Sequence, residues 1–85
     1  MKVRIPTPLL SYTSVKEVGA AGATLHEVLA DLDRQFPGLR FRVIDEQDRM
    51  RPHMRFFLNG EQVFDLSIAV KPSDELALVQ ALSGG

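Results

Sequence analysis

The stretch TLHEVLADLDRQFPG, residues 24–38, carries the clearest structural signal in the chain. Its apolar side chains recur at spacings of three and four residues, which places them on one face of a helix. These residues are Leu25, Val28, Leu29, Leu32 and Phe36. Thr24 followed by Glu27 fits a capping box, in which the Thr hydroxyl accepts the third backbone N–H and the Glu reaches back to the cap. Because Pro37 and Gly38 end the pattern, we expect one amphipathic helix of about three turns that packs on a sheet.

Five short strands are expected around this helix. Alternation at period two, or a short apolar run between turn signals, predicts strands at residues 2–5, 14–18, 55–58, 61–64 and 75–82. Asn59-Gly60 is the strongest short hairpin signal in the chain. The other stretches are expected as loops at 9–13 and 19–23, a short helix or strand and then an exposed loop over 39–54, and a long connection at 65–74. One helix among five strands predicts an α+β domain in which the helix covers one face of a mixed five-strand sheet.

The composition is that of an ordinary small domain. The 85 residues carry a net charge of −1, with 45% hydrophobic and 25% charged residues, and they suffice for one domain. This balance lacks the basic excess that binds nucleic acid or an anionic membrane, so we expect neither partner. The longest apolar run is far below the roughly 18 residues that span a bilayer, and the first residues form no signal-peptide core. We therefore expect a cytoplasmic protein.

Residue types that carry catalysis or bind metals are sparse. The chain has no cysteine, which excludes disulfides, thiolate ligands and cysteine nucleophiles. His26 and His53 have no neighbouring histidine at ligand spacing, so no metal site is expected. No serine stands in a G-x-S-x-G turn, and so small a domain has little room for a pocket that buries a substrate. We expect no catalytic residue and no bound cofactor, and therefore no enzyme.

Arginines are concentrated in residues 40–55, at Arg40, Arg42, Arg49, Arg51 and Arg55. Carboxylates lie among them, at Asp45, Glu46 and Asp48, so the run lacks the uncompensated charge of a phosphate-binding stripe. Two interpretations stay open, a solvated charged loop and a docking surface for an acidic protein partner.

Period-two alternation assigns the last strands to two faces of the sheet. If the final strand lies beside the first in the sheet centre, Leu76 and Leu78 face the helix. The residues of that strand that turn away are Ala77, Val79 and Ala81. Phe57 and Val79 would then form an exposed apolar patch, with Leu82 beyond the strand, and such patches usually mark partner surfaces. The alternative is a bulge that buries both side chains.

The sequence ends on Ser83-Gly84-Gly85, directly after this strand. Without bulky side chains, such a backbone can enter a narrow channel in extended conformations closed to other residues. The reactive group that it delivers is a terminal carboxylate, which acyl transfer to a nucleotide phosphate activates. A frayed terminus without a role is the alternative. We expect a folded domain over residues 1–82 and a flexible diglycine tail over residues 83–85.

Four segments together resemble the ubiquitin-like sulfur carriers of the β-grasp fold, which include the molybdopterin-synthase small subunit and the thiamine sulfur carrier. They are the helix over residues 24–32, the hairpin Phe56-Phe57-Leu58-Asn59-Gly60, the strand entry Asp74-Glu75-Leu76, and Gly84-Gly85. Ile5-Pro6-Thr7-Pro8-Leu9-Leu10 and Phe36-Pro37-Gly38-Leu39-Arg40 are most similar to the branch that donates sulfur for cysteine synthesis. The chain departs from that branch at residues 67–72, where a glycine-rich turn is usual, and at Ser83, where alanine is more frequent.

The resemblance implies a carrier on which partner enzymes act. A ubiquitin-activating-type adenylyltransferase would adenylate the carboxylate of Gly85 with ATP, and a sulfur source would replace AMP to leave a thiocarboxylate. A cysteine-synthase-like enzyme or the large subunit of molybdopterin synthase would accept the sulfur, and a metalloprotease is a further expected partner. Gly84 and Ser83 would form the tail, and we interpret the docking surface as Phe57, Val79, Ala81 and Leu82. The alternatives are a molybdopterin-synthase small subunit and a ubiquitin-like modifier conjugated through Gly85.

Overall fold

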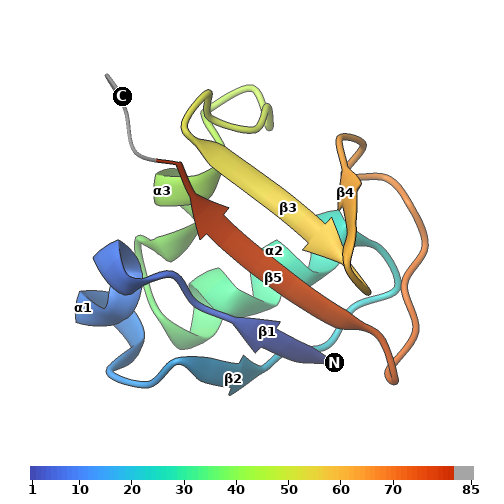
Figure 1. Ribbon diagram of the computed structural model, residues 1–85, viewed down its shortest axis with the longest axis horizontal. Coiled ribbons are helices and arrows are strands. Elements are labelled where there is room, and N and C mark those ends of the chain that lie inside the picture. The colour runs from blue at the N-terminus through green and yellow to red at the C-terminus, as the bar shows by residue number, and fades with distance from the viewer. Residues whose placement is uncertain (82–85) are drawn as a thin grey trace.

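The structure is a computed structural model that describes residues 1–81 of the chain (Figure 1). In this part of the chain one sheet is formed by β1 (Lys2–Arg4), β2 (Glu17–Gly19), β3 (Met54–Leu58), β4 (Glu61–Val63) and β5 (Glu75–Gln80). The helices are a 3-10 turn (Thr7–Leu9), α1 (Leu10–Thr13), α2 (Leu25–Gln35) and α3 (Leu39–Val43). The predicted α+β class, with a mixed five-strand sheet and one main helix, is confirmed.

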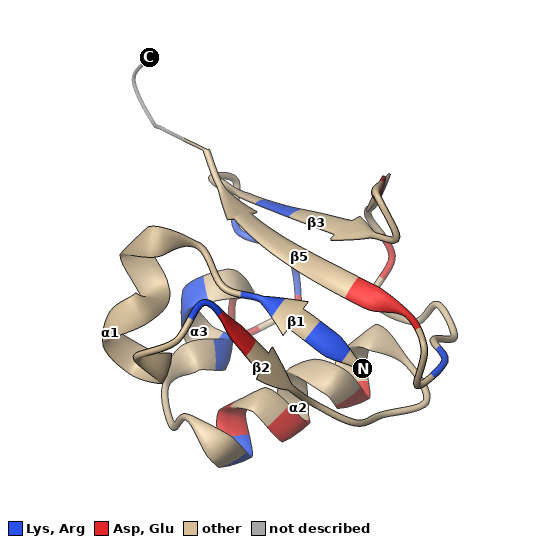
Figure 2. Cartoon of the chain, turned by 60° about the horizontal axis from the view of Figure 1, so that its bottom comes forward, with Lys and Arg blue, Asp and Glu red and all other residues tan. Residues whose placement is uncertain are grey.

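β5 occupies the centre of the sheet. The strand order is β2-β1-β5-β3-β4, in which β5 runs parallel to β1 and antiparallel to β3. Leu76 and Leu78 turn into the core and are 1% and 2% exposed. Figures 1 and 2 show α2 and α3 on one side of the sheet, and no helix of residues 1–81 covers the other side. The predicted place of the last strand beside the first is therefore confirmed.

The main helix, α2, begins where the capping pattern predicts. Thr24 is its N-cap, and the Thr24 hydroxyl accepts a hydrogen bond from the backbone N–H of Glu27 at 3.3 Å. The Glu27 carboxylate accepts from the backbone N–H of Ala23 at 3.3 Å, not from that of Thr24 as the capping box predicts. It therefore satisfies a donor one residue before the cap. The predicted apolar face is confirmed, since the core contains Leu25, Val28, Leu29 and Leu32, with Phe36 packed against them.

The segment between β1 and β2 is helical, so the predicted loop at residues 9–13 is wrong. The 3-10 turn and α1 bury Leu9 and Thr13, which are 3% and 7% exposed. A helix of four residues is too short to leave a recognisable period in the sequence. Ser14 ends α1 with a φ of 64°, in the left-handed region. The chain comes into register with β1 only at Glu17, opposite Arg4, so β2 starts later than the strand predicted at 14–18.

The second half of the chain differs from prediction mainly at the ends of elements. Residues 39–43 form a helix, which decides between the two alternatives for that stretch. Asn59 and Gly60 have φ values of 51° and 86°, as a tight hairpin turn requires. β4 ends at Val63, one residue before its predicted end, and Phe64 leaves the sheet. β5 ends at Gln80, whereas the predicted strand extends to residue 82, which lies outside the described residues.

Candidate functional site

Phe57 and Val79 lie on the open face of the sheet, as predicted. Phe57 stands in register between Gln62 of β4 and Ala77 of β5, and Val79 stands opposite Arg55 of β3. Val79 is 41% exposed, whereas Phe57 and Ala77 are half-buried. The pairing of β3 with β5 runs without interruption from end to end, so the alternative of a bulge that buries both side chains is wrong. Phe57, Ala77 and Val79 form a continuous apolar surface, here called the open-face patch.

Charged residues border the open-face patch on the side of β1. The Lys2 ammonium lies 3.6 Å from the Glu75 carboxylate and 3.8 Å from that of Glu17, and the Arg4 guanidinium lies 3.5 Å from Glu17. Figure 2 shows these blue segments of β1 between the red segments of β2 and β5. All four side chains are at least 44% exposed, so the pairs contribute little to stability. An apolar centre with a polar rim is the usual composition of a protein–protein interface.

The end of β5 is anchored beside this patch. The backbone N–H of Ala81 donates to the carbonyl oxygen of His53 at 2.7 Å, one residue beyond the last β3–β5 pair. Ala81 is half-buried and follows Val79 by two residues. The other predicted site residues, namely Leu82, Ser83, Gly84 and Gly85, lie outside the described residues, and their roles stay predictions.

The charged loop at residues 45–51 contains its own ion pairs. The Arg49 Nε lies 3.1 Å from the Asp45 carboxylate, and the Arg40 Nη2 lies 2.7 Å from that of Asp48. Backbone hydrogen bonds from Arg49 and Gln47, with the Arg49 guanidinium beside them, hold the pKa of Asp45 below its ordinary value of 3.8. For Arg40 and Arg49, the loop itself compensates the positive charge.

Neither histidine belongs to a group of side chains in residues 1–81 that could hold a metal ion. The Nε2 of His26, on α2, is 3.5 Å from the Asp48 carboxylate, and His53 precedes β3. No group of three His, Cys, Asp or Glu side chains in this range could hold a metal ion. None of the helices in the described part of the chain is long and apolar enough to cross a membrane.

Sequence reasoning missed one exposed aromatic side chain close to the end of β5. Phe41 of α3 is 56% exposed, and it lines a groove that also contains Gln80. The alternation around Phe41 fits a strand and a helix equally well. Only the helix that forms turns Leu39 and Val43 into the core and Phe41 outward.

Comparison with known proteins identifies relatives over nearly the whole chain. The sequence model described as the ThiS family matches residues 3–85. The chain is 32% identical, over 89 aligned positions, to the sulfur carrier protein CysO of Mycobacterium bovis. This alignment covers 98% of the present chain and 96% of that protein.

Two solved structures share the fold at similar coverage. A chain in the crystal structure of the Amycolatopsis orientalis BexX/CysO complex superposes with a TM-score of 0.90 at 32% identity, covering 99% of this chain and 98% of that one. The crystal structure of Mycobacterium tuberculosis CysO superposes with a TM-score of 0.89 at 29% identity, covering 95% and 98%. The expected ubiquitin-like β-grasp fold is thereby confirmed. With a family match from residue 3 to residue 85 and a relative 32% identical over almost its full length, the chain belongs to the ThiS family.

Proposed function

We propose that this protein is a sulfur carrier that donates sulfur for the synthesis of cysteine or a related sulfur metabolite. The observation that carries the proposal is the near full-length identity of 32% to a protein named sulfur carrier protein CysO. The family match continues to residue 85, so it includes Gly84 and Gly85. In this role the protein is a cosubstrate of partner enzymes, and it needs no catalytic residue or bound cofactor of its own.

The proposed chemistry takes place at the carboxylate of Gly85. In a ubiquitin-activating-type adenylyltransferase, a carboxylate oxygen attacks the α-phosphorus of ATP, pyrophosphate leaves, and an acyl-adenylate forms. A sulfide equivalent then attacks the acyl carbon and AMP leaves, so a thiocarboxylate replaces the carboxylate. In a synthase, the sulfur of this thiocarboxylate acts as the nucleophile that attacks the acceptor substrate. Gly84 and Ser83 carry small side chains or none, which suits passage into a narrow active site.

We further propose that the open-face patch, continued by Ala81 and Leu82, is the surface on which these enzymes dock. Val79 is exposed and Phe57 and Ala77 are half-buried beside paired charges, and β5 ends at Gln80, which precedes Ala81 and Leu82 in the chain. The partners are the adenylyltransferase and a sulfur-accepting synthase, for which a cysteine-synthase-like enzyme is the first candidate and the molybdopterin-synthase large subunit the second. A metalloprotease is a third proposed partner. The absence of cysteine also supports the proposal, because no side-chain thiol competes for the sulfur.

Mass spectrometry tests the reaction after incubation with the activating enzyme, ATP and a sulfide source. Replacement of one carboxylate oxygen by sulfur raises the mass by about 16 Da. A chain without Gly85 should show no mass increase, although its unfolding in urea should be unchanged because a chain end contributes little stability. Ser83→Ala is the matched control and should still gain sulfur. The proposal fails if the intact chain gains no sulfur from any cognate activating enzyme.

Immunoblots of cell extract distinguish a sulfur carrier from a protein modifier, which would be conjugated to lysines through the same activated carboxylate. A dedicated carrier predicts free protein only. A ladder of high-mass conjugates that disappears on deletion of Gly85 would instead support the modifier alternative.

A further inference from the structure

A groove of about 330 Å³ lies at the end of β5, on the side opposite the open-face patch. Its lining includes the apolar residues Pro8 and Phe41 and the polar residues Arg42, Arg51, His53 and Gln80. We call it the Arg42–Arg51 groove. Because side chains alternate along β5, Gln80 faces this groove and its neighbour Val79 faces the open side of the sheet. The groove and the patch therefore flank the same end of the strand.

The structure separates the arginines of residues 40–55 into three groups by their contacts. Arg40 and Arg49 form ion pairs within the charged loop. Arg55 lies on β3 and donates from Nη1 to the backbone carbonyls of Pro52 and Met54, at 2.7 and 2.9 Å. Among residues 1–81, no ion pair reaches Arg55 or the remaining two, Arg42 and Arg51.

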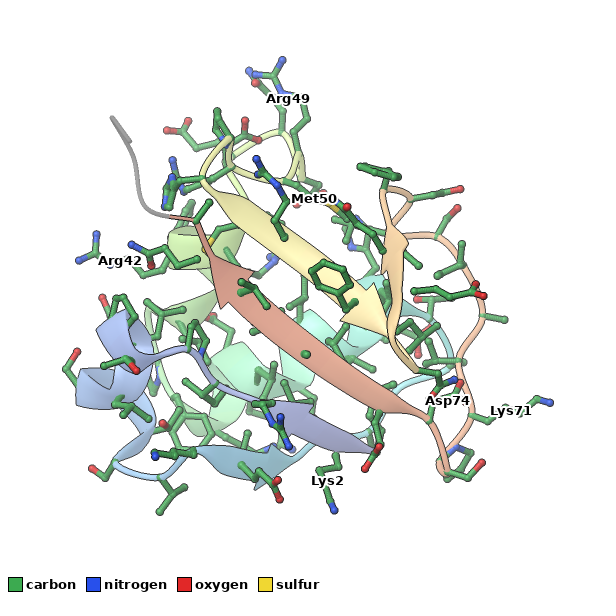
Figure 3. All side chains as sticks on the ribbon, viewed as in Figure 1. Lys2, Arg42, Arg49, Met50, Lys71 and Asp74 are labelled. Atoms are coloured by element: carbon green, nitrogen blue, oxygen red, sulfur yellow. The ribbon has the colours of Figure 1, made fainter. Side chains whose placement is uncertain are left out.

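Both of these arginines lie on one groove, and within residues 1–81 no acidic side chain lines it. Arg42 extends from α3 with its guanidinium carbon 5.9 Å from the centre of the Tyr12 ring (Figure 3). Arg51 is held by its Nε, which donates to the backbone carbonyl of Phe41, and by its backbone N–H, which donates to Val43 at 3.1 Å. The backbone of His53 is fixed by the hydrogen bond from Ala81. The groove is therefore preformed, and it presents guanidinium donors whose forked geometry matches a carboxylate.

We propose that the Arg42–Arg51 groove is a second docking site, which receives a segment of the partner enzyme that carries an acidic side chain next to an apolar one. The carboxylate would pair with Arg42 and Arg51, and the apolar side chain would cover Phe41 and Pro8. The exposed fraction of 56% for Phe41 and the uncompensated positive charge beside it support this occupant. The inference rests on the proposed function, in which the partner is an enzyme that acts at Gly85, four residues after Ala81 in the sequence. Such an enzyme would hold the end of β5 from both sides.

A peptide titration followed by NMR tests the groove directly, with the full 85-residue chain and acetyl-Glu-Phe-Glu-amide as the probe. We expect saturable shifts of the Arg51 Nε–H, the His53 backbone amide and the Gln80 side-chain amide. The isosteric peptide acetyl-Gln-Phe-Gln-amide should produce none. Equal shifts with both peptides, or no saturable shift with the acidic one, would overturn the proposal.

Two charge reversals locate the effect. Arg42→Glu should weaken binding of the acidic peptide by about tenfold or more. Lys71→Glu changes the net charge equally, on an exposed residue at the far end of the molecule (Figure 3), and should leave binding unchanged. Equal losses in the two variants would show a non-specific effect of net charge and would refute a defined site.

A variant that lacks residues 82–85 tests whether the chain's own terminus occupies the groove. Its Arg51 Nε–H signal should match that of the full chain without peptide. A clear shift on truncation would mean that the terminal carboxylate occupies the groove, and this would overturn a partner segment as the occupant. The titration needs no activating enzyme, so failure of sulfur transfer at Gly85 and failure of the groove are separate results.

Discussion

Replacement of Val79 by alanine tests whether the open face of the sheet is the docking surface. Val79→Ala removes two methyl groups, each of which contributes about 0.8 kcal/mol when it becomes fully buried. Since 41% of Val79 is exposed, covering that part in a complex contributes about 0.7 kcal/mol through these two groups. Because 1.4 kcal/mol corresponds to a tenfold change in affinity, Val79→Ala should weaken binding of the adenylyltransferase by about threefold.

Isothermal titration calorimetry with the purified adenylyltransferase measures this change. Val15→Ala is the matched control, because Val15 is also a valine and is 51% exposed, but it lies between α1 and β2, outside the patch. Its affinity should stay at the wild-type value. Urea denaturation of both variants checks the fold. Substitution of Val79, which lies on β5, should cost about 1 kcal/mol at most.

Two results would refute this reasoning. The first is an equal loss of affinity for Val79→Ala and Val15→Ala, which would indicate a general effect of exposed apolar residues. The second is unchanged affinity in a double variant with Phe57→Ala and Val79→Ala. In that case the enzyme would bind another face, even if sulfur transfer to Gly85 still occurs.

Three further predictions concern stability. Phe56→Ala should lower the free energy of unfolding in urea by about 3–5 kcal/mol, because Phe56 is 0% exposed in the core. Gly22→Ala should lower the thermal midpoint, because a Cβ there would lie 2.7 Å from the backbone of α2, whereas Gly19→Ala, with nothing within 4 Å, should be nearly neutral. Two hydrogen bonds lower the pKa of Asp74 below its ordinary value of 3.8. The larger effect comes from the Asn59 side chain and the smaller one from the backbone N–H of Lys71. As the pH falls below about 4, Asp74 is protonated in the unfolded state before it is protonated in the folded state. The free energy of unfolding therefore decreases until the pH has passed the lower pKa of the folded state. Asp74→Asn should flatten this loss in urea unfolding curves recorded between about pH 5 and pH 2.

Each of these predictions has a result that contradicts it. Equal destabilisation by Phe56→Ala and Phe57→Ala would mean that the two faces of β3 are not assigned correctly. Equal effects of Gly22→Ala and Gly19→Ala would exclude the close approach at α2 as the cause. An acid transition with the same steepness in Asp74→Asn would assign the loss of stability to other carboxylates.

Elements with local signals could be predicted from the sequence, and those without them could not. The helix α2 has a cap and a repeating apolar face, and the Asn59-Gly60 turn has its own backbone preference, so both are found where predicted. The four-residue helix α1 has no such local signal. It is stabilised by the burial of Thr13 and of Leu9, the residue directly before the helix. The start of β2 was misplaced for the same reason, since the course of α1 determines where the chain meets β1.

The candidate site could be predicted in part. Alternation along β3 and β5 placed Phe57 and Val79 on the open face, and the register confirms that both lie there. The Arg42–Arg51 groove could not be predicted. Its residues come from the 3-10 turn, α3, the loop before β3 and the end of β5, which are distant in sequence. Only their packing brings the side chains together.

The sequence by itself determined the main helix α2, the Asn59-Gly60 turn and the two faces of the central strands. Capping, helical periodicity, strand alternation and turn preference act between residues that are close in the chain, so they can be read from it. The tertiary structure alone decided how the arginines are distributed. Arg40 and Arg49 meet carboxylates of the charged loop, whereas Arg42 and Arg51 line the groove beside Gln80. Which of these arginines meets a carboxylate depends on how the charged loop folds and how it packs beside α3, and the spacing of charges along the chain does not specify the resulting distances.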